Sequence, residues 1–169
     1  MQADPQLLQW FNAIDTDRRG TLDVKELQKA LALGHLNFSL KMVANLIRAH
    51  DQDREGRLNF TEFQNLHRYL MELQQRFASV DVQRTGHLTL PQLEQALAQG
   101  GFRLDQGALN ALFYSYDAEK DGYVGLPEFI AMSVFMRSAA STFAAFDAQR
   151  RGTVTLDFNQ FIYAGAQLV

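Results

Sequence analysis

The chain of 169 residues is 47% hydrophobic and 21% charged, with a formal net charge of −3 and no cysteine. Such a composition is too apolar for a disordered protein and suits one compact domain, or two small ones that share a core. The near balance of acidic and basic residues argues against a nucleic-acid partner. The lack of cysteine excludes disulfides, thiolate metal sites and a cysteine nucleophile, and charged residues interrupt every long apolar stretch, so we expect neither a transmembrane helix nor a secretory signal.

The acidic residues gather in five windows of equal length, which hold fifteen of the nineteen Asp and Glu side chains. Each window has Asp at its first position, Gly at its sixth and Leu or Val at its eighth. The windows begin at Asp15, Asp51, Asp81, Asp117 and Asp147. This pattern is typical of a calcium-binding loop, because such a loop supplies oxygens from positions 1, 3, 5, 7 and 9 and from a bidentate Glu at position 12. Glycine at position 6 permits the sharp turn.

The first window, residues 15–26, is expected to bind calcium with reduced affinity. Its expected ligands are Asp15, Asp17, Asp23, Glu26 and the carbonyl oxygen of Thr21. Position 5 is Arg19, whose side chain cannot ligate calcium, and this weakens the site. The segment that follows, 27–50, contains Gly34 and then Ser39, the signals of a helix end and a new helix start, so two helices and a turn are expected there.

The second window, residues 51–62, has the fullest set of oxygens. Its expected ligands are Asp51, Asp53, Glu55, Asn59, Glu62 and the carbonyl oxygen of Arg57. The segment after it, 63–80, contains no Gly or Pro. It predicts one continuous helix of about 27 Å that is shared by the second and third windows.

The third window, residues 81–92, is expected to be empty because position 12 is the neutral Gln92, which removes the charged clamp. Gln83 and Thr85 at its third and fifth positions also lack a carboxylate. The next segment, 93–116, contains Gly100 and Asp105 and again predicts two helices joined by a turn.

The fourth window, residues 117–128, is expected to bind calcium. Its expected ligands are Asp117, Glu119, Asp121, Glu128 and the carbonyl oxygen of Tyr123. A second uninterrupted helix, 129–146, leads to the fifth window, which has Gln149, Arg151 and no acid at position 12. We expect this last loop to be empty and structural, which leaves about two to three calcium sites.

The windows repeat as pairs along the chain. A single shift of the sequence aligns the first two windows with the third and fourth, and the third with the fifth. Loops of this type pair through a short β-bridge at position 8, so the first can pair with the second and the third with the fourth. The fifth window has Val154 at this position and no partner within the chain, and apolar residues Phe158, Phe161 and Ile162 follow it. These four residues predict a dimer interface between fifth loops of two chains. The alternative is that the last helix packs on its own core.

Five such windows, whose starts are separated by alternately longer and shorter intervals, resemble the penta-EF-hand family. The usual Glu-Phe ending of the fifth window is displaced by two residues to Gln160-Phe161, which is a trait of this family, and the segment from Leu8 to Arg18 is most similar to its apoptosis-linked calcium-adaptor branch. The resemblance covers about residues 5–169 and implies an all-α fold of about eight helices. It places five EF-hands in a single domain, 1–169, at about 5–33, 39–70, 71–99, 105–136 and 137–167.

The resemblance also implies a function, that of a cytoplasmic calcium sensor and adaptor. Such a protein dimerises through its fifth hand, as a homodimer or as a heterodimer with another family member. On calcium loading it binds peptide segments of target proteins, or is recruited to membranes. A regulatory subunit of a calcium-dependent protease and a calcium buffer are the alternatives. No nucleophile motif or phosphate-binding loop is present, so no enzymatic activity is expected.

Overall fold

The computed structural model describes residues 5–117 and 119–168, so both limits of the predicted domain, residues 1 and 169, lie outside the described residues. The described residues form eight α-helices and four strands of two residues each. In chain order these elements are α1 (Pro5–Ile14), β1 (Thr21–Leu22), α2 (Val24–Leu33), α3 (Leu40–His50), β2 (Leu58–Asn59), α4 (Phe60–Val80), β3 (His87–Leu88), α5 (Leu90–Gln99), α6 (Gln106–Tyr116), β4 (Val124–Gly125), α7 (Leu126–Phe146) and α8 (Phe158–Ala166). The all-α architecture expected from the sequence is confirmed.

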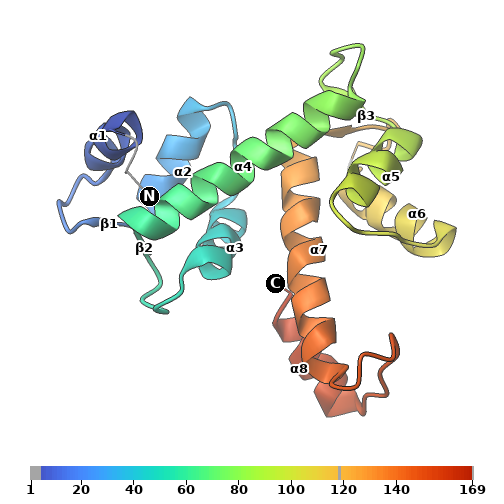
Figure 1. The fold of residues 1–169 in the computed structure, drawn as a ribbon. Helices are drawn as coiled ribbons and strands as arrows, with labels where there is room; N and C mark the ends of the chain where they lie inside the picture. The colour runs from blue at the N-terminus through green and yellow to red at the C-terminus, as the bar shows by residue number, and fades with distance from the viewer. Residues whose placement is uncertain (1–4, 118, 169) are drawn as a thin grey trace.

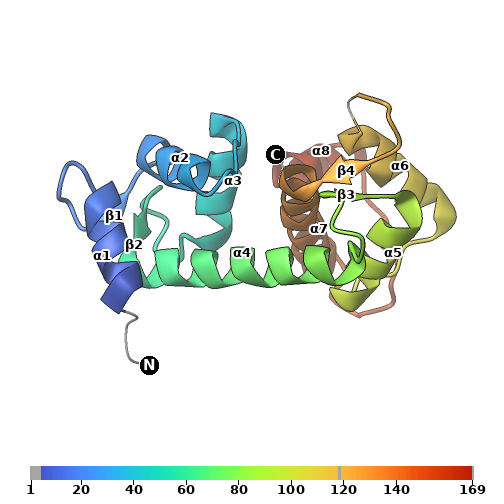
Figure 2. The same ribbon diagram turned by 90° about the horizontal axis from the view of Figure 1, so that it is seen from above.

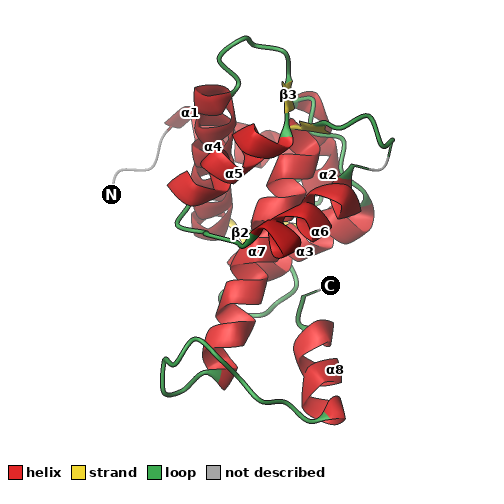
Figure 3. Cartoon of the chain, turned by 90° about the vertical axis from the view of Figure 1, so that its right-hand side faces the viewer, coloured by secondary structure: helices red, strands yellow, loops and turns green. Residues whose placement is uncertain are grey.

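Two lobes share the long helix α4 (Figure 1). Helices α1, α2 and α3 lie beside its first half, and α5 and α6 lie at its other end. Seen from above, α4 runs along one side of both lobes (Figure 2). Helix α7 starts in the second lobe and continues beyond it, so its C-terminal end and α8 project away from the rest of the molecule (Figure 3).

The turns between helices lie where the glycines and capping residues predict them. Gly34 is the C-cap of α2 and Gly100 is the C-cap of α5. Ser39 and Asp105 are the N-caps of α3 and α6, and each side chain accepts a hydrogen bond from the backbone N–H three residues later. These side chains satisfy N–H groups that have no partner within the helix.

The two shared helices begin three residues earlier than expected, at Phe60 and Leu126. The N-cap of α4 is Asn59, position 9 of the second window, whose side chain accepts a hydrogen bond from the N–H of Glu62. The last three positions of the window are therefore already helical, and position 12 lies in the first turn of the exiting helix.

The loops pair as the eighth positions predict. Strands β1 and β2 are antiparallel, with Leu22 opposite Leu58, and β3 and β4 are antiparallel, with Leu88 opposite Val124. All four side chains are buried. Each pair thus fixes two loops side by side and adds a small apolar contact beneath them.

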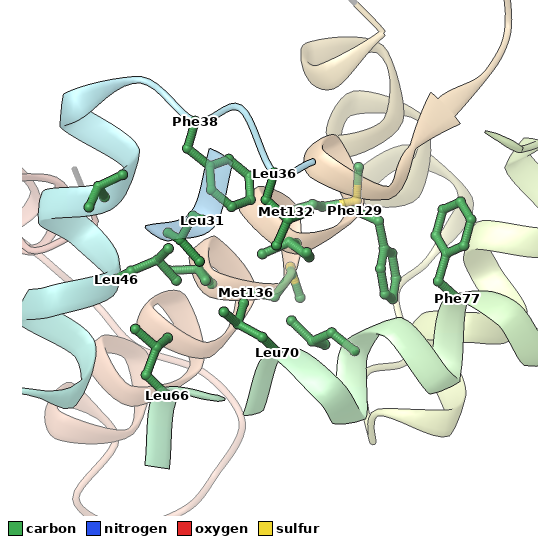
Figure 4. Close-up of a cluster of buried hydrophobic side chains, with 14 of the residues drawn as sticks. Leu31, Leu36, Phe38, Leu46, Leu66, Leu70, Phe77, Phe129, Met132 and Met136 are labelled. Carbon is green, nitrogen blue, oxygen red and sulfur yellow. The ribbon is translucent and has the colours of Figure 1, made fainter. Parts of the chain in front are cut away.

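The two lobes are joined by one buried apolar cluster, and Figure 4 shows its central part between α2, α3, α4 and α7. The labelled residues are Leu31, Leu36, Phe38, Leu46, Leu66, Leu70, Phe77, Phe129, Met132 and Met136. Met132 and Met136 are buried here, which favours core packing over an exposed adaptable surface. Helix α7 is the one described helix that is long and apolar enough to cross a membrane by length and composition, and 33% of the window that meets this test is buried inside the protein.

Candidate calcium sites

All five loops share one backbone conformation, and the aspartate at position 1 holds it. Its two carboxylate oxygens accept hydrogen bonds from the backbone N–H groups of positions 5 and 6, over 2.7–3.1 Å. The glycine at position 6 has φ between +74° and +82° in each loop, a region in which other side chains are strained. The first aspartate therefore stabilises the backbone conformation of every loop, including those that lack a full set of metal ligands.

A basic residue occupies position 4 of each loop, a feature that was not predicted from the sequence. It adopts a left-handed backbone conformation with φ between +52° and +61°. These residues are Arg18, Arg54, Arg84, Lys120 and Arg150. The signal was present as a Lys or Arg three residues after the first aspartate of every window. Non-glycine residues in this conformation carry some strain, which the hydrogen-bonded loop sustains.

Loop 1 brings Asp15, Asp17 and Glu26 together, with one carboxylate oxygen from each within 4.8 Å of the others. The Glu26 carboxylate is buried and accepts hydrogen bonds from the N–H of Thr16 at 2.9 Å and from the N–H of Asp23 at 3.0 Å. Burial raises the pKa of Glu26, but these hydrogen bonds outweigh it and lower the pKa below its usual value. The clamp residue is thus held ionised and in place.

Loop 2 repeats this arrangement with Asp51, Asp53 and Glu62, whose oxygens lie equally close. Glu62 is buried, and its carboxylate accepts hydrogen bonds from the N–H of Gln52 at 2.7 Å and from the N–H of Asn59 at 3.0 Å. Three acidic side chains around one small space suit a divalent cation with hard oxygen ligands. These residues fit calcium.

Glu55 and the two residues with predicted carbonyl ligands, Thr21 and Arg57, are not part of these acidic clusters. Glu55 is exposed, and its backbone N–H, rather than its carboxylate, contacts Asp51. Thr21 begins β1, and Arg57 directly precedes β2, so both predicted carbonyl ligands sit next to the paired strands. A calcium ion in either loop would draw on these carbonyls.

A contact between the two loops was missed from the sequence. The Nε of Arg57 donates to the Oγ1 of Thr21 at 2.9 Å, and its Nη2 lies 3.2 Å from the Oδ2 of Asp17 and 3.8 Å from the Oε2 of Glu26. Arg19 approaches the same Asp17 oxygen at 3.1 Å. The available signal was a cation at position 7, next to the strand that pairs with the other loop.

Loop 4 is less well assembled than loops 1 and 2. Asp117 is buried and closes the loop, and Asp121 accepts a hydrogen bond from the N–H of Tyr123 at 3.0 Å. Glu119 and Asp121 are exposed, and Glu128 is only half-buried. Among the described residues, three or more acidic side chains converge only in loops 1 and 2.

Neutral side chains replace the clamp in loops 3 and 5. The amide of Gln92 accepts a hydrogen bond from the N–H of Thr89 at 2.9 Å and donates one to the carbonyl oxygen of Val80 at 3.0 Å. In loop 5, the side-chain oxygen of Gln160 likewise accepts a hydrogen bond from the N–H of Asp157 at 3.0 Å. These amides preserve the loop and the helix start without supplying a carboxylate.

The predicted dimer residues lie on the projecting part of the chain. Phe158, Phe161 and Ile162 are 75%, 63% and 53% exposed, and no residue of α8 is fully buried. Val154 is half-buried, and the described part of loop 5 contains no paired strand. A hydrogen bond links the end of α8 to α7: the Ser138 hydroxyl donates to the carbonyl oxygen of Gln167, the C-cap of α8, at 3.0 Å.

A groove of about 1130 Å³ lies between α3 and α7 and extends to the end of α8. Apolar side chains of α7, including Val134 and Phe135, form one wall. Asp51, the first predicted ligand of loop 2, borders it. The basic residues along the groove are Lys41, Arg48, Arg54 and Arg137.

Comparisons with known proteins agree with this geometry. A model of the EF-hand domain pair matches residues 4–68 and again 70–134. Human sorcin is 30% identical over 166 residues, which span 95% of this chain and 82% of sorcin. Mouse grancalcin is 28% identical over 95% of the chain and 74% of its own length, and Xenopus laevis peflin is 28% identical over 94% of the chain and 57% of its own length.

A solved structure shows the same arrangement of helices. It is that of a homologue of programmed cell death 6 protein from Leishmania major Friedlin, with a TM-score of 0.73 and 29% sequence identity, over 96% of this chain and 94% of that one. The paired loops, the acidic clusters and the matched domain pairs define an EF-hand protein. With its fifth loop and these relatives, the chain belongs to the penta-EF-hand family of calcium-binding proteins.

Proposed function

We propose that this protein is a cytoplasmic calcium sensor and adaptor, which binds calcium through loops 1, 2 and 4 and then engages a partner. The observation that carries the proposal is the pair of converging acidic clusters in loops 1 and 2. In both, the clamp glutamate lies in the first turn of an exiting helix, so a change at the loop is passed directly to that helix.

Helix α4 provides a route from loop 2 to the rest of the molecule. Glu62 lies in its first turn, whereas Phe77 near its end packs against Phe129 of α7, with ring centroids 5.8 Å apart. Asp51 of the same loop also borders the groove between α3 and α7. Loop 2 therefore has one direct connection to the groove, through Asp51, and one indirect connection, through α4 and its contact with α7.

We propose that a partner's peptide segment occupies this groove when calcium is high. The apolar wall suits apolar side chains of the segment, and the four basic residues favour acidic ones. An apolar dye tests whether calcium increases the accessible apolar surface. A rise in dye fluorescence on calcium addition, absent in Glu62→Gln, is expected for a sensor; no rise would identify a calcium buffer, which barely opens.

We further propose that the fifth hand pairs with the fifth hand of a second chain. The support is the unpaired loop 5 together with the exposed apolar side chains of α8, which form a patch that a monomer would leave in water. Pairing of identical surfaces would give a two-fold dimer. A heterodimer with another family member is the other form of the same interface.

Light scattering after size exclusion tests the dimer. The Val154→Asp and Phe161→Asp variants are expected to halve the mass, because each places a charge in the apolar interface. The matched control is Val82→Asp in loop 3, where the side chain is 82% exposed and no interface is expected. An unchanged dimeric mass in the first two variants would contradict pairing through hand five, and co-purification of a larger protease chain from cells would favour the regulatory-subunit alternative.

A further inference from the structure

The side chain of Arg57 crosses from loop 2 into the calcium site of loop 1. The antiparallel bridge that places Leu22 opposite Leu58 brings the neighbouring Arg57 beside loop 1. Its guanidinium makes two hydrogen bonds there, to Thr21 and to Asp17, and its side chain is only 22% exposed. The Arg57 side chain is therefore mostly shielded from solvent, whereas the Asp17 side chain that it contacts is 34% exposed.

Arg57 contacts two of the three carboxylates of the loop 1 cluster. Asp17 and Glu26 occupy positions 3 and 12, and their oxygens lie 3.2 and 3.8 Å from the Nη2 of Arg57. The same nitrogen, Nη2, approaches both carboxylates while Nε donates to Thr21, so the positive charge offsets the mutual repulsion of the two acids when no metal is bound. The cation thus supplies part of the charge compensation that calcium would supply.

Among the ion pairs of the described residues, none places such a cation on the acids of loop 2 in return. Position 7 of loop 1 is Thr21, a neutral residue, and positions 7 of the other three loops are His87, Tyr123 and Thr153. Among the described residues, the ion pairs found within the calcium loops all involve Asp17 or Glu26 of loop 1. The two clusters are therefore alike in their acids but differ in the cation placed on them.

We propose that Arg57 is an internal competitor of calcium at loop 1, and that loop 1 consequently fills only after loop 2. The guanidinium must release Asp17 and Glu26 before their oxygens can converge on a metal. The inference rests on the proposed function, because it assumes that loop 1 takes calcium. It goes further because it proposes that a residue of the neighbouring loop lowers the calcium affinity of loop 1.

Competition predicts opposite effects of one substitution on two quantities. The Arg57→Gln variant is expected to bind calcium at loop 1 at least about threefold more tightly, because its competitor is gone. The same variant is expected to lose about 2–4 °C of metal-free Tm, because Asp17 and Glu26 each lose one cationic contact, although Asp17 keeps its ion pair with Arg19. A merely supporting role for Arg57 would weaken calcium binding and lower the Tm together.

The experiment is calorimetric calcium titration of the full chain in a Glu62→Gln, Glu128→Gln background, in which loop 1 retains its clamp. Arg18→Gln is the matched control, because Arg18 is an exposed cation next to Asp17 and makes no ion pair among the described residues. It reports the general effect of removing one positive charge. The Arg57→Lys variant, which keeps the charge but not the fork, is expected to fall between wild type and Arg57→Gln and decides the matter if the latter does not fold.

Tighter binding in Arg57→Gln than in Arg18→Gln, with a lower metal-free Tm, would support competition. Equal tightening in both, weaker binding in Arg57→Gln, or no calcium binding at loop 1 in any variant would overturn it. Titration of the wild-type chain separates this from the proposed function. If the wild type binds calcium in a way that Glu62→Gln reduces, the sensor proposal stands even where the competition fails.

Discussion

The residue at position 12 decides what kind of loop each EF-hand becomes. Glu26 and Glu62 are buried carboxylates that accept backbone hydrogen bonds from their own loops before any metal binds. Gln92 occupies the same place and makes the same cap with Thr89, but its amide also donates to Val80. At this position a carboxylate offers two oxygens that can bind a cation. An amide offers one oxygen, and its nitrogen instead donates a hydrogen bond within the protein.

The Glu62→Gln variant is expected to lose calcium at loop 2 while keeping its fold. The structure supports this because Gln92 and Gln160 already form the same cap with a neutral amide. Calorimetric titration should show one fewer site of measurable affinity, and the metal-free free energy of unfolding should fall by about 1–3 kcal/mol, because an amide keeps the cap on Asn59 but cannot also accept from the N–H of Gln52. Glu94→Gln, which removes an exposed acid outside the loops, is the control. An unchanged number of sites would contradict the role of Glu62.

The Gln92→Glu variant is expected to destabilise the metal-free protein. A carboxylate cannot donate to the carbonyl oxygen of Val80, so the hydrogen bond is lost and two acceptors face each other. The expected loss is about 1–3 kcal/mol in the free energy of unfolding, measured by urea denaturation with a chelator. Gln83→Glu, an exposed position of the same loop, should change it little. Equal stabilities would show that the contact with Val80 contributes nothing.

At the scale of the element, the two halves of the continuous helix α7 differ in burial. Its first half contains all of its fully buried residues, from Phe129 to Met136, and belongs to the core that joins the lobes. Beyond Arg137 the helix leaves the core, and Phe143 is 41% exposed. This explains why α7 is apolar throughout: its first half packs inside the molecule, and its second half leads to the exposed α8.

The two halves of α7 are expected to respond differently to truncation. Phe129→Ala removes a fully buried ring that packs on Phe77, and should lower the free energy of unfolding by about 3–5 kcal/mol. Phe143→Ala should lower it by less than about 1 kcal/mol when measured at the same protein concentration. Urea denaturation of the metal-free chain makes the comparison. Similar losses in both variants would mean that the exposed half is covered in solution, as a dimer would cover it.

At the scale of the whole molecule, contacts between lobes involve more than apolar packing. Arg137 of α7 reaches His50 at the end of α3, with its Nη1 3.4 Å from the ring Nε2, and its guanidinium lies 5.2 Å from the centre of the Tyr69 ring. Burial, aided by the charge of Arg137, lowers the pKa of His50 below its usual value. His50 immediately precedes Asp51, the first predicted ligand of loop 2, so the second lobe contacts the residue next to that proposed calcium site.

Calcium loading changes the charge of the whole molecule. Three bound ions would change the formal net charge from −3 to about +3. We expect sedimentation with anionic vesicles at about 100 micromolar calcium, a concentration at or above the range of sensor EF-hands, and none in chelator, because a positive protein is drawn to an anionic surface. Neutral vesicles and the Glu62→Gln variant are the controls. Equal pelleting with and without calcium would rule out calcium-dependent membrane recruitment.

The local features of this protein followed from the sequence by itself. The five loops, the two shared helices, the turns at Gly34 and Gly100 and the pairing of Leu22 with Leu58 all arise from short-range patterns that recur along the chain. Such features depend on backbone conformation and hydrophobic period, which a few neighbouring residues determine. The position of Glu26 and Glu62 at the start of an exiting helix, where the sequence predicts the calcium clamps, belongs to this group.

Only the tertiary structure showed which side chains from different repeats meet. Arg57 lies over the acids of loop 1, Arg137 lies against His50, and α8 stands apart with its phenylalanines exposed. The sequence left two places open for the last helix, on its own core or against another chain, because both satisfy the same apolar pattern. These contacts join residues up to 87 positions apart, and they depend on how whole helices pack, which no local pattern encodes.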